Sequence, residues 1–565
     1  MSSHTKYIKP LLWVVLLIVV LLFGSWLSGY ILFLWFGFSD RPVGLGTYLA
    51  YYKQVDLPKV AMHAGKIKVS GALGFGLPLL AYLGLLALVF KAKPNSTHGD
   101  ARFANRSDLA AAGLLKSSTT GIIVGRDGGA YLRDSGQKFV ILAAPTRSGK
   151  GVGIVVPNLL DYGQSAVVLD IKGENFNLTS GYRAKIGQEV FVFNPFAENG
   201  QTHRWNPFRY VSNEHHKRIG DIRSIAQMLY PDGNGGGNER FFTDNAKNVF
   251  LALSLYLFEQ HVDNNKSGFK SEYPSFGRLY RLAAGNGTEL KPYLQKLSES
   301  PFLSDAAKTA FAGVLSQADE TFSSILGTFN APLTAWADPF LDAATAADDF
   351  LLTDVRRKPM TIYLCVGPNK LSQASLIFNL FFSQLINENT KVLPQDDPTL
   401  KYQCLLLMDE FTSIGPVEII AHAVSYMAGY NIRLLPIIQS MAQLDATYGK
   451  EKARTLITNH ATQIIYTPRE QQDANDYSEM LGYTTVRKRN MTRGREVTYS
   501  ESEERRALML PQELKAMSPN QEILLIEGMN SPARVDKIRY YQEKMFKDRL
   551  LTPVKLPTLN IHVNK

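Results

Sequence analysis

The sequence predicts an α/β protein with a doubly wound, mostly parallel β-sheet, an all-helical insertion domain and two preceding transmembrane helices. Three observations support this fold class. Two long uncharged stretches lie near the N-terminus, short apolar runs then alternate with amphipathic segments, and one long interval shows helical periodicity only. A chain of 565 residues also exceeds what one hydrophobic core normally organises, so we expect several structural units.

Residues 1–94 are predicted to form a membrane anchor. The stretches 11–36 and 69–90 carry no charge and are long enough to cross a bilayer. A cleavable signal peptide is the alternative for the first stretch, but its apolar region is too long for one. Two spans place both chain ends on the same side, with the short loop 37–68 on the other. Two spans are also too few for a secondary transporter.

Composition constrains the compartment and the partners. The chain has 61 Lys and Arg against 51 Asp and Glu, a net charge of +10, which weakly favours nucleic acid or anionic lipid as a partner. Basic residues flank the two spans on both sides, so the charge pattern alone does not set the orientation. Cys365 and Cys404 both lie in apolar runs with no paired spacing. This excludes a disulfide framework or zinc site and indicates a reducing compartment.

A nucleotide-binding domain is predicted in two parts, residues 95–209 and 333–540. Eight short runs rich in Val, Ile and Leu are expected to be strands, several of them buried on both faces of a parallel sheet. Amphipathic segments between them predict right-handed helical crossovers. The runs are 139–144, 166–170, 190–193, 361–366, 404–408, 433–438, 463–466 and 523–526.

The interval 210–332 lacks a strong strand signal and is predicted to be an all-helical insertion domain. Helical periodicity is clear in 241–258 and 304–329, and the glycine-rich patch Gly233–Gly237 is typical of a flexible connection. The alternative is that these helices simply cover the same sheet.

A phosphate-binding loop follows the first predicted strand. The strand leads directly into Ala144-Pro-Thr-Arg-Ser-Gly-Lys-Gly151, and an apolar helix begins near Val152. Lys150 is expected to reach the β- and γ-phosphates of ATP, and the backbone N–H groups of 147–151 to surround the β-phosphate. The predicted nucleotide-binding residues are Thr146, Arg147, Ser148, Gly149, Lys150, Gly151 and Val152.

Two positions depart from the strict phosphate-loop pattern. Ala144 replaces the first glycine, and Gly151 replaces the Ser or Thr that normally binds Mg²⁺. The second change removes a metal ligand, so that water or another hydroxyl must replace it. An accidental match to the motif is the alternative.

Acidic residues are expected on the same sheet at the carboxyl end of another strand. In Leu405-Leu-Leu-Met-Asp-Glu410, Asp409 would hold Mg²⁺ through water, and Glu410 would orient or deprotonate the attacking water. Gln439 follows the strand 433–438 and could contact the γ-phosphate. The alternative for Gln439 is a polar residue that merely ends a strand.

With these motifs in place, the chain resembles the coupling-protein ATPases of type IV secretion and conjugation, the TraG/TraD-like branch of RecA-like motor proteins. The likeness extends over nearly all of residues 1–540. The segments that carry it are His98-Gly-Asp-Ala-Arg-Phe103, Ala144–Gly153, Val167-Val-Leu-Asp-Ile-Lys-Gly-Glu174, Trp205-Asn-Pro207, Phe241-Phe-Thr-Asp-Asn-Ala246, Met408-Asp-Glu-Phe411, Ile438-Gln-Ser-Met-Ala-Gln-Leu444, Asn459-His460, Arg505-Arg506 and Leu510-Pro-Gln-Glu513.

The resemblance implies an inner-membrane, Mg²⁺-dependent ATPase with its body in the cytoplasm, which forms a ring, usually of six subunits. It implies ATP sites between neighbouring subunits, DNA in a central channel, and an insertion domain that helps to select substrates. The implied partners are a relaxase bound to single-stranded DNA, or a secreted protein, and the secretion channel. Asp170, Lys172 and Glu174 would lie beside the nucleotide, with a surface cluster of ion pairs as the alternative. The tail 541–565 is short and slightly basic, unlike the long acidic tails that recruit substrates in some relatives.

Several basic residues are candidates for further roles. Arg487-Lys-Arg489, Arg493 and Arg495 predict either a DNA-contacting loop or hairpin, or a solvated loop. Arg433, Arg454 and Arg469 are equal candidates for the arginine that a neighbouring subunit supplies. Two other functions stay in view: a DNA translocase of chromosome segregation, and a nucleotide-binding scaffold that docks substrates without moving them.

Overall fold

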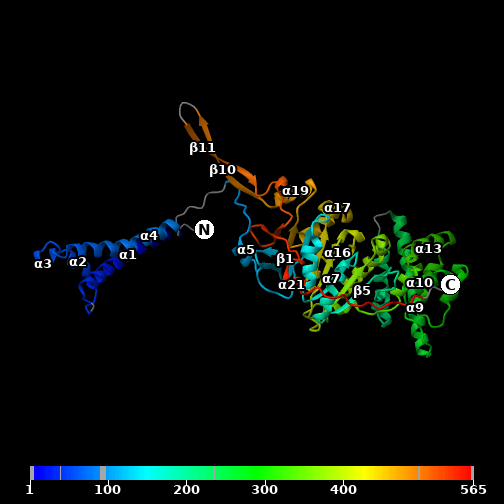
Figure 1. Ribbon diagram of the computed structural model, residues 1–565. Coiled ribbons are helices and arrows are strands. Elements are labelled where there is room, and N and C mark those ends of the chain that lie inside the picture. The colour runs from blue at the N-terminus through cyan, green and yellow to red at the C-terminus, as the bar shows by residue number, and fades with distance from the viewer. Residues whose placement is uncertain (1–4, 39, 90–96, 233–235, 494–496, 562–565) are drawn as a thin grey trace. The chain divides into compact units, whose positions relative to one another are not determined.

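The computed structural model describes residues 5–38, 40–89, 97–232, 236–493 and 497–561, and it divides into two units. Unit 1 comprises Met1–Thr97 and unit 2 comprises His98–Lys565 (Figure 1). Phe90, Arg495 and the last four residues of the predicted tail lie outside the described residues, as does most of the glycine-rich patch.

Unit 1 contains two long apolar helices that pack against each other. They are α1 (Thr5–Phe36) and α4 (Ala64–Val89), joined through the short helices α2 (Thr47–Tyr52) and α3 (Pro58–Ala61). Within them, 13–36 and 64–87 are long and apolar enough to cross a membrane, by length and composition. Small residues permit the close packing, because a Cβ on Gly74 would meet Ser28 Oγ at 2.2 Å.

The core of unit 2 is one eleven-stranded sheet with the order β2-β1-β13-β12-β9-β3-β8-β7-β4-β6-β5. Each predicted run forms a strand, and the strands from β9 to β5 in this order are all parallel to their neighbours. Continuous apolar sequence is required here because helices cover both faces. Their bounds are β3 (Val140–Ala143), β4 (Ser165–Asp170), β5 (Glu189–Phe193), β6 (Met360–Cys365), β7 (Cys404–Met408), β8 (Ile432–Ile438), β9 (Thr462–Ile465) and β12 (Gln521–Ile526).

The other end of the sheet is antiparallel, and the sequence did not predict its last three strands. They are β1 (Ile122–Asp127), β2 (Ala130–Asp134) and β13 (Ala533–Asp536). Gly128-Gly129 forms the two-residue connection between β1 and β2, a turn that favours positive φ. β12 was expected to be a strand of the doubly wound sheet, and it runs antiparallel to β9.

Helices alone fill the described residues between β5 and β6. The buried face of α9 includes Phe250 and Phe258, which belong to the same hydrophobic core as Phe381 of α15 (Leu371–Asn389) on the sheet. The expected boundary 332/333 falls inside α13, and short helices continue to Arg356. The longer helices of this segment are α8 (His215–Leu229), α9 (Gly237–Lys266), α10 (Phe276–Ala283), α11 (Leu290–Ser298), α12 (Asp305–Leu315), α13 (Asp319–Leu333) and α14 (Pro339–Ala344).

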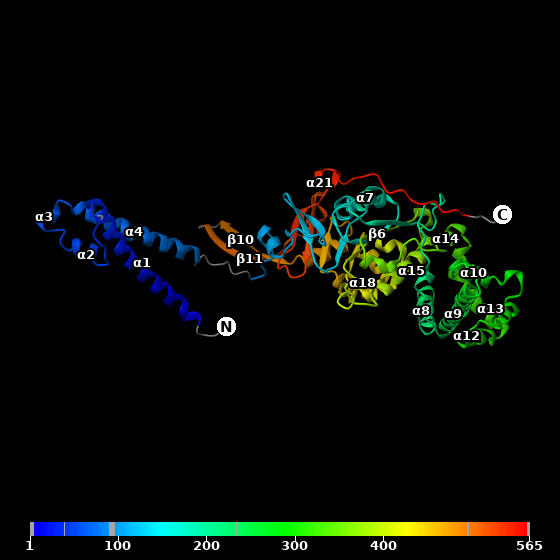
Figure 2. The same ribbon diagram turned by 90° about the horizontal axis from the view of Figure 1, so that it is seen from below.

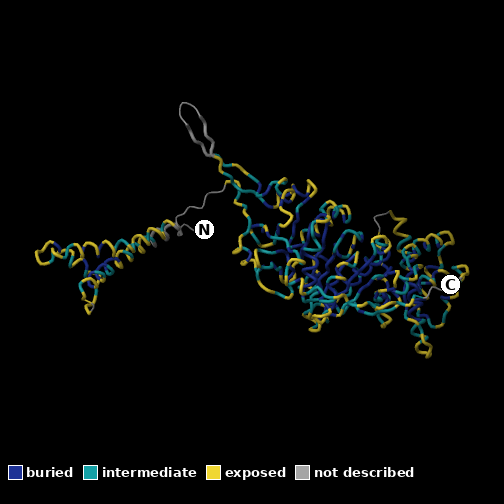
Figure 3. Tube along the Cα trace, in the orientation of Figure 1, coloured by how far each residue is buried: buried dark blue, intermediate teal, exposed yellow. Residues whose placement is uncertain are grey.

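Burial follows this layered arrangement. Figure 3 shows buried residues concentrated along the sheet and the adjoining helices of unit 2, with exposed residues on the outer turns. Arg183, on α7 (Glu174–Lys185), is fully buried, and its guanidinium donates to Tyr162 O at 2.6 Å and Gln164 O at 2.6 Å. The core therefore tolerates a cation because its donors are paired.

A long hairpin projects from unit 2 (Figure 1), formed by β10 (Tyr483–Arg493) and β11 (Val497–Ala507). Residues 98–101 pair with its base: Thr485 N donates to Gly99 O at 3.0 Å, and Ala101 N donates to Tyr483 O at 3.1 Å. The first residues of unit 2 thus form a short β-bridge with β10, centred on Asp100 and Thr484.

The C-terminal tail lies along the surface of unit 2 after α21 (Lys544–Lys547), and Figure 2 shows it passing α7. Val554 N donates to Ser180 Oγ at 3.2 Å, and Leu559 N donates to Gly200 O at 2.9 Å. Gly181 faces the tail so closely that a Cβ there would lie 2.1 Å from Thr552 O. The described residues of the tail are therefore docked on the surface of unit 2.

Candidate nucleotide-binding site

The phosphate-binding loop begins where β3 ends. Ala144 N donates to Ile438 O at 2.9 Å, which fixes the start of the loop to the end of β8. Arg147 (φ 59°) and Gly149 (φ 90°) adopt positive φ, the alternation that turns successive N–H groups toward one concave face. One amide is already used, because Ser148 N donates to Pro145 O at 3.1 Å. The expectation that the N–H groups of 147–151 surround a phosphate stays a prediction, and at Ser148 it requires this bond to be exchanged for the phosphate.

The first turn after the loop, Gly151–Val155, is a π-helix rather than an α-helix. Gly153 is buried there, and a Cβ on it would lie 2.5 Å from Tyr466 Oη. A glycine is therefore needed for the turn to pack on β9. Such wider turns often mark functional sites.

Lys150 lies between the two acidic side chains that follow β7. Its Nζ is 2.5 Å from Glu410 Oε1 and 3.1 Å from Asp409 Oδ1. The first contact is a hydrogen bond, whereas the second is an ion pair without hydrogen-bond alignment, since Asp409 Oδ1 is buried and accepts no hydrogen bond in the described residues. Glu410 has φ 58°, so the backbone turns sharply just after the strand and presents both carboxylates on the same side as Lys150.

Gln439 connects the loop to Glu410. Its Nε2 donates to Glu410 Oε2 at 2.8 Å, and its Oε1 accepts from Thr146 Oγ1 at 3.0 Å. The side chains of Thr146, Gln439, Glu410 and Lys150 therefore form a continuous chain of contacts across β3, β7 and β8. The alternative interpretation, in which Gln439 is only a polar residue at the end of a strand, does not account for these two hydrogen bonds.

The acidic side chains differ in their proton affinity. Burial raises the pKa of Asp409, although Lys150 opposes the change. For Glu410, burial would also raise the pKa, but the hydrogen bonds from Lys150 and Gln439 outweigh it and hold the pKa below its usual value. Glu410 is thus ionised at neutral pH, as a base or water-orienting group must be.

Asp170, at the end of β4, is 2% exposed and does not belong to a surface cluster of ion pairs. It accepts from Phe176 N at 2.8 Å and from Asn175 Nδ2 at 3.3 Å, and so holds the start of α7. Burial raises its pKa to about 6, and the nearby carboxylate of Asp409 adds to the rise. Lys172 and Glu174 are exposed.

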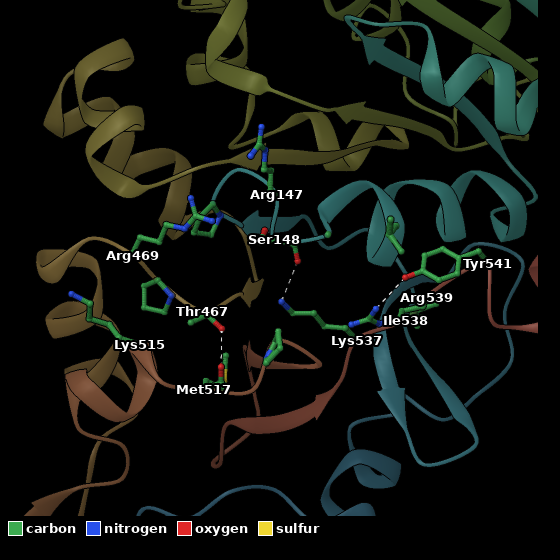
Figure 4. A pocket seen from close by; sticks show the side chains of 15 residues that line it. Arg147, Ser148, Thr467, Arg469, Lys515, Met517, Lys537, Ile538, Arg539 and Tyr541 are labelled. Carbon is green, nitrogen blue, oxygen red and sulfur yellow. Dashed lines mark hydrogen bonds between the residues drawn. The ribbon is translucent and has the colours of Figure 1, made fainter.

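A pocket of about 600 Å³ lies on the other side of the phosphate-binding loop (Figure 4). Loop residues Arg147, Ser148 and Gly149 form one wall, and the segments that follow β9 and β13, together with residues 515–519 ahead of β12, form the rest. Its five basic lining residues come from four places in the sequence, a pattern with no local spacing that could have predicted it. They are Arg147, Arg469, Lys515, Lys537 and Arg539.

Lys537 crosses the floor of this pocket. Its Nζ lies 3.4 Å from the ring centroid of Tyr466 and 3.5 Å from Ser148 O (Figure 4). Burial lowers its pKa to about 8, and Arg539 contributes to the decrease, whereas Glu522 opposes it. Glu522 is fully buried, and burial raises its pKa well above the usual value.

The remaining predicted residues are dispersed. Arg433 is fully buried in this chain's own core and donates to Lys138 O at 2.7 Å and Thr120 O at 2.8 Å, which excludes it as the arginine supplied to a neighbour. Arg454 is exposed on α18 (Lys450–Thr458), and Arg469 lines the pocket of its own subunit. In the hairpin, Arg487 Nε lies 3.1 Å from Glu503 Oε1, so that its charge is partly neutralised.

The donor set fits a Mg–nucleotide complex. No group of three or more His, Cys, Asp or Glu side chains among the described residues forms a metal cage. Mg²⁺ does not need one, because it usually takes one or two carboxylates and completes its shell with phosphate and water. Asp409 supplies such a carboxylate, and the buried Ser148 Oγ, which has no partner in the described structure, is a free hydroxyl in the loop.

Comparison with known proteins identifies the family. The sequence model described as "Type IV secretory system Conjugative DNA transfer" matches residues 102–561. The chain belongs to this family. It is 31% identical to Protein VirD4 of Rhizobium radiobacter over 491 residues, which cover 84% of this chain and 68% of VirD4. It is 27% identical to the conjugal transfer protein TraG of Escherichia coli over 472 residues, covering 76% of this chain and 72% of TraG.

Comparison with solved structures shows that this chain has the same fold as a type IV coupling protein, TrwB. The bacterial conjugative coupling protein TrwB lacking its N-terminal segment has a TM-score of 0.57 at 16% identity, and the match covers 81% of this chain and 99% of TrwB. TrwB in complex with the ATP analogue ADPNP has a TM-score of 0.56 at 15% identity, covering 84% and 100%. The expected RecA-like, mostly parallel fold is confirmed, and the antiparallel end is part of it.

Proposed function

We propose that this coupling protein is an inner-membrane ATPase that binds Mg–ATP and uses its hydrolysis to drive or gate transfer of a substrate through a type IV secretion channel. One observation carries the proposal: Lys150 of the phosphate-binding loop contacts Glu410, and Gln439 holds the other oxygen of that carboxylate. The complexes of TrwB with ADPNP and with ADP and Mg²⁺ support the same choice of ligands.

The proposed roles follow from the geometry. Lys150 exchanges its contact with Glu410 for the β- and γ-phosphates, which releases Glu410 to orient and deprotonate water. Asp409 would hold Mg²⁺, and Gln439 would link the γ-phosphate to Thr146 and Glu410. The ion supplies charge neutralisation on the phosphates. Loop residues Thr146–Val152 enclose the phosphates, with Ser148 contributing its hydroxyl.

The pocket beside the loop is proposed to hold the base and ribose end of the nucleotide. It adjoins Arg147 and Ser148, and it opens between chain segments that follow three strands of the same sheet. Its cations would retain a polyanion near the loop before the phosphates are seated. Hydrophobic contact is available from Met517 and Tyr541.

Anchoring and assembly complete the proposal. α1 and α4 span the bacterial inner membrane, and unit 2 lies in the cytoplasm, where ATP is present. A homo-oligomeric ring, expected to be hexameric, places exposed Arg454 or Arg469 at a neighbour's site. The helices of 210–332 contact the substrate, which is a relaxase with its single-stranded DNA or a secreted protein.

The test is steady-state ATP hydrolysis by the purified full-length protein, with and without single-stranded DNA. Lys150→Ala is expected to abolish turnover, and Glu410→Gln to lower it by about 10²–10⁴-fold while nucleotide binding is retained. Lys185→Ala, a change at an exposed lysine of α7, serves as the matched control. Unchanged turnover in Lys150→Ala refutes the site. If export survives in Glu410→Gln, the protein is a docking scaffold and not a motor.

A further inference from the structure

A second pocket lies at the opposite edge of the sheet from Lys150. It has a volume of about 790 Å³ and is bounded by the start of β9, the end of β12 and residues 98–101. β9 runs parallel to β3, so its first residues lie at the edge away from the phosphate-binding loop. The pocket is thus independent of the nucleotide site.

The charged side chains among the described residues that line this pocket are negative. Asp100 and Glu527 are exposed carboxylates, and the lining includes no lysine or arginine. Three nearby cations already have partners of their own: Arg102 forms an ion pair with Asp108, Lys138 Nζ donates to the backbone oxygen of Glu527, and Arg505 lies over the ring of Tyr483. The pocket therefore attracts positive charge.

Two buried acceptors in the wall point to the same ligand chemistry. His460, in the Asn459-His460 motif, is 2% exposed, and its Nδ1 lies 2.6 Å from Leu456 O. A carbonyl only accepts, so Nδ1 carries the proton; burial lowers the pKa of the ring to about 4, and Nε2 is left as a bare acceptor. Nε2 has no partner in the described structure, and neither does Gln463 Oε1.

We propose that this pocket binds a lysine or arginine side chain from the cytoplasmic, membrane-adjacent segment of a membrane protein partner. A guanidinium or ammonium group offers donors only, which matches the two carboxylates and the two unpaired buried acceptors of the wall. The identity of the partner rests on the membrane anchoring proposed above. Eight residues separate Val89, at the end of α4, from His98 in the wall, a reach of at most about 30 Å. Segments of membrane proteins on that side are rich in Lys and Arg.

The test is fluorescence anisotropy with a labelled, capped Gly-Arg-Lys-Arg-Gly peptide. The protein is the nucleotide-free full chain in phosphatidylcholine nanodiscs, whose lipids carry no net charge, and Gly-Gln-Gln-Gln-Gly is the control peptide. The double variant Asp100→Asn/Glu527→Gln is expected to weaken binding of the basic peptide at least tenfold. The variant Glu198→Gln/Asp263→Asn, which removes two exposed carboxylates elsewhere, is expected to bind as wild type does.

His460→Phe then tests the buried acceptor, and we expect a further loss of affinity, which His460→Gln restores in part because its amide oxygen accepts. Equal affinities of wild type and Asp100→Asn/Glu527→Gln overturn the proposal, as does an equal loss in the matched control. Self-association that depends on Asp100 and Glu527, without peptide binding, would make a second copy the occupant and also overturn it. ATP hydrolysis, measured in parallel, separates this result from the proposed function.

Discussion

Gln439 Nε2 donates to Oε2 of Glu410 at 2.8 Å, while Lys150 holds the other oxygen of the same carboxylate. One side chain thus links the acidic residue to Thr146 in the loop. In the proposed function, a nucleotide that displaces Lys150 would alter the hydrogen bond between Gln439 and Glu410. We propose that Gln439 senses the phosphates in this way.

Gln439→Ala is expected to lower ATP turnover by about 10²-fold, because a positioned donor aimed at developing charge is lost. Nucleotide affinity should change far less, since the loop and Lys150 remain. Gln472→Ala, at an exposed glutamine on α19 (Gln471–Met480), is the control. Turnover and ADP affinity are measured separately. An equal loss in both would mean that Gln439 only supports the loop.

Lys537 predicts a pH dependence of nucleotide affinity. Its pKa of about 8 means that its charge is lost between about pH 7 and 9, a range in which other lysines stay protonated. Affinity for ADP is therefore expected to fall across this range in wild type and to fall less in Lys537→Gln. Titrations with a fluorescent ADP analogue at several pH values measure this, and parallel curves for the two proteins would contradict it.

Lys537 also makes the free energy of unfolding depend on pH in a known direction. Because its folded-state pKa lies below the ordinary value of 10.5, the unfolded chain binds more protons between about pH 8 and 10.5. Its contribution to the free energy of unfolding therefore increases as pH rises through this window. Urea denaturation of wild type and Lys537→Gln at the two ends of the window should show the smaller increase in the variant.

Gly181→Ala is expected to detach the tail from α7. Alanine would favour the helix by about 1 kcal/mol, but its Cβ cannot coexist with Thr552 O at 2.1 Å. Faster trypsin cleavage at Lys555 is the readout. Gly313→Ala, in α12 where a Cβ meets nothing within 4 Å, should leave cleavage unchanged and raise the melting temperature.

Arg433→Met should destabilise unit 2 by about 3–5 kcal/mol, because the carbonyl oxygens that it satisfies become unpaired in the core. ATP turnover per folded molecule is expected to persist. Thermal unfolding and active-site titration measure the two effects. Loss of turnover in a fully folded variant would restore Arg433 as a candidate for catalysis.

The sequence predicted the central strands because continuous apolar runs are required of strands buried on both faces, as in 404–408. Lys150, Asp409 and Glu410 could be grouped because parallel strands end at a common edge. β1 was not predicted, because its polar end and its irregular register at Gly125 weaken the alternation expected of a strand. The basic pocket was not predicted either, because Lys515 and Lys537 lie in separate segments of the sequence that come together only in the folded protein.

The pairing of residues 98–101 with β10 has a mechanical consequence. His98 N donates to Thr485 Oγ1 at 3.1 Å, and the backbone bonds of Gly99 and Ala101 lie beside it. Tension applied along the direction of residues 98–101 would load these neighbouring bonds together instead of opening them one at a time. Part of such a force would therefore be transmitted through these hydrogen bonds to β10 and the rest of unit 2.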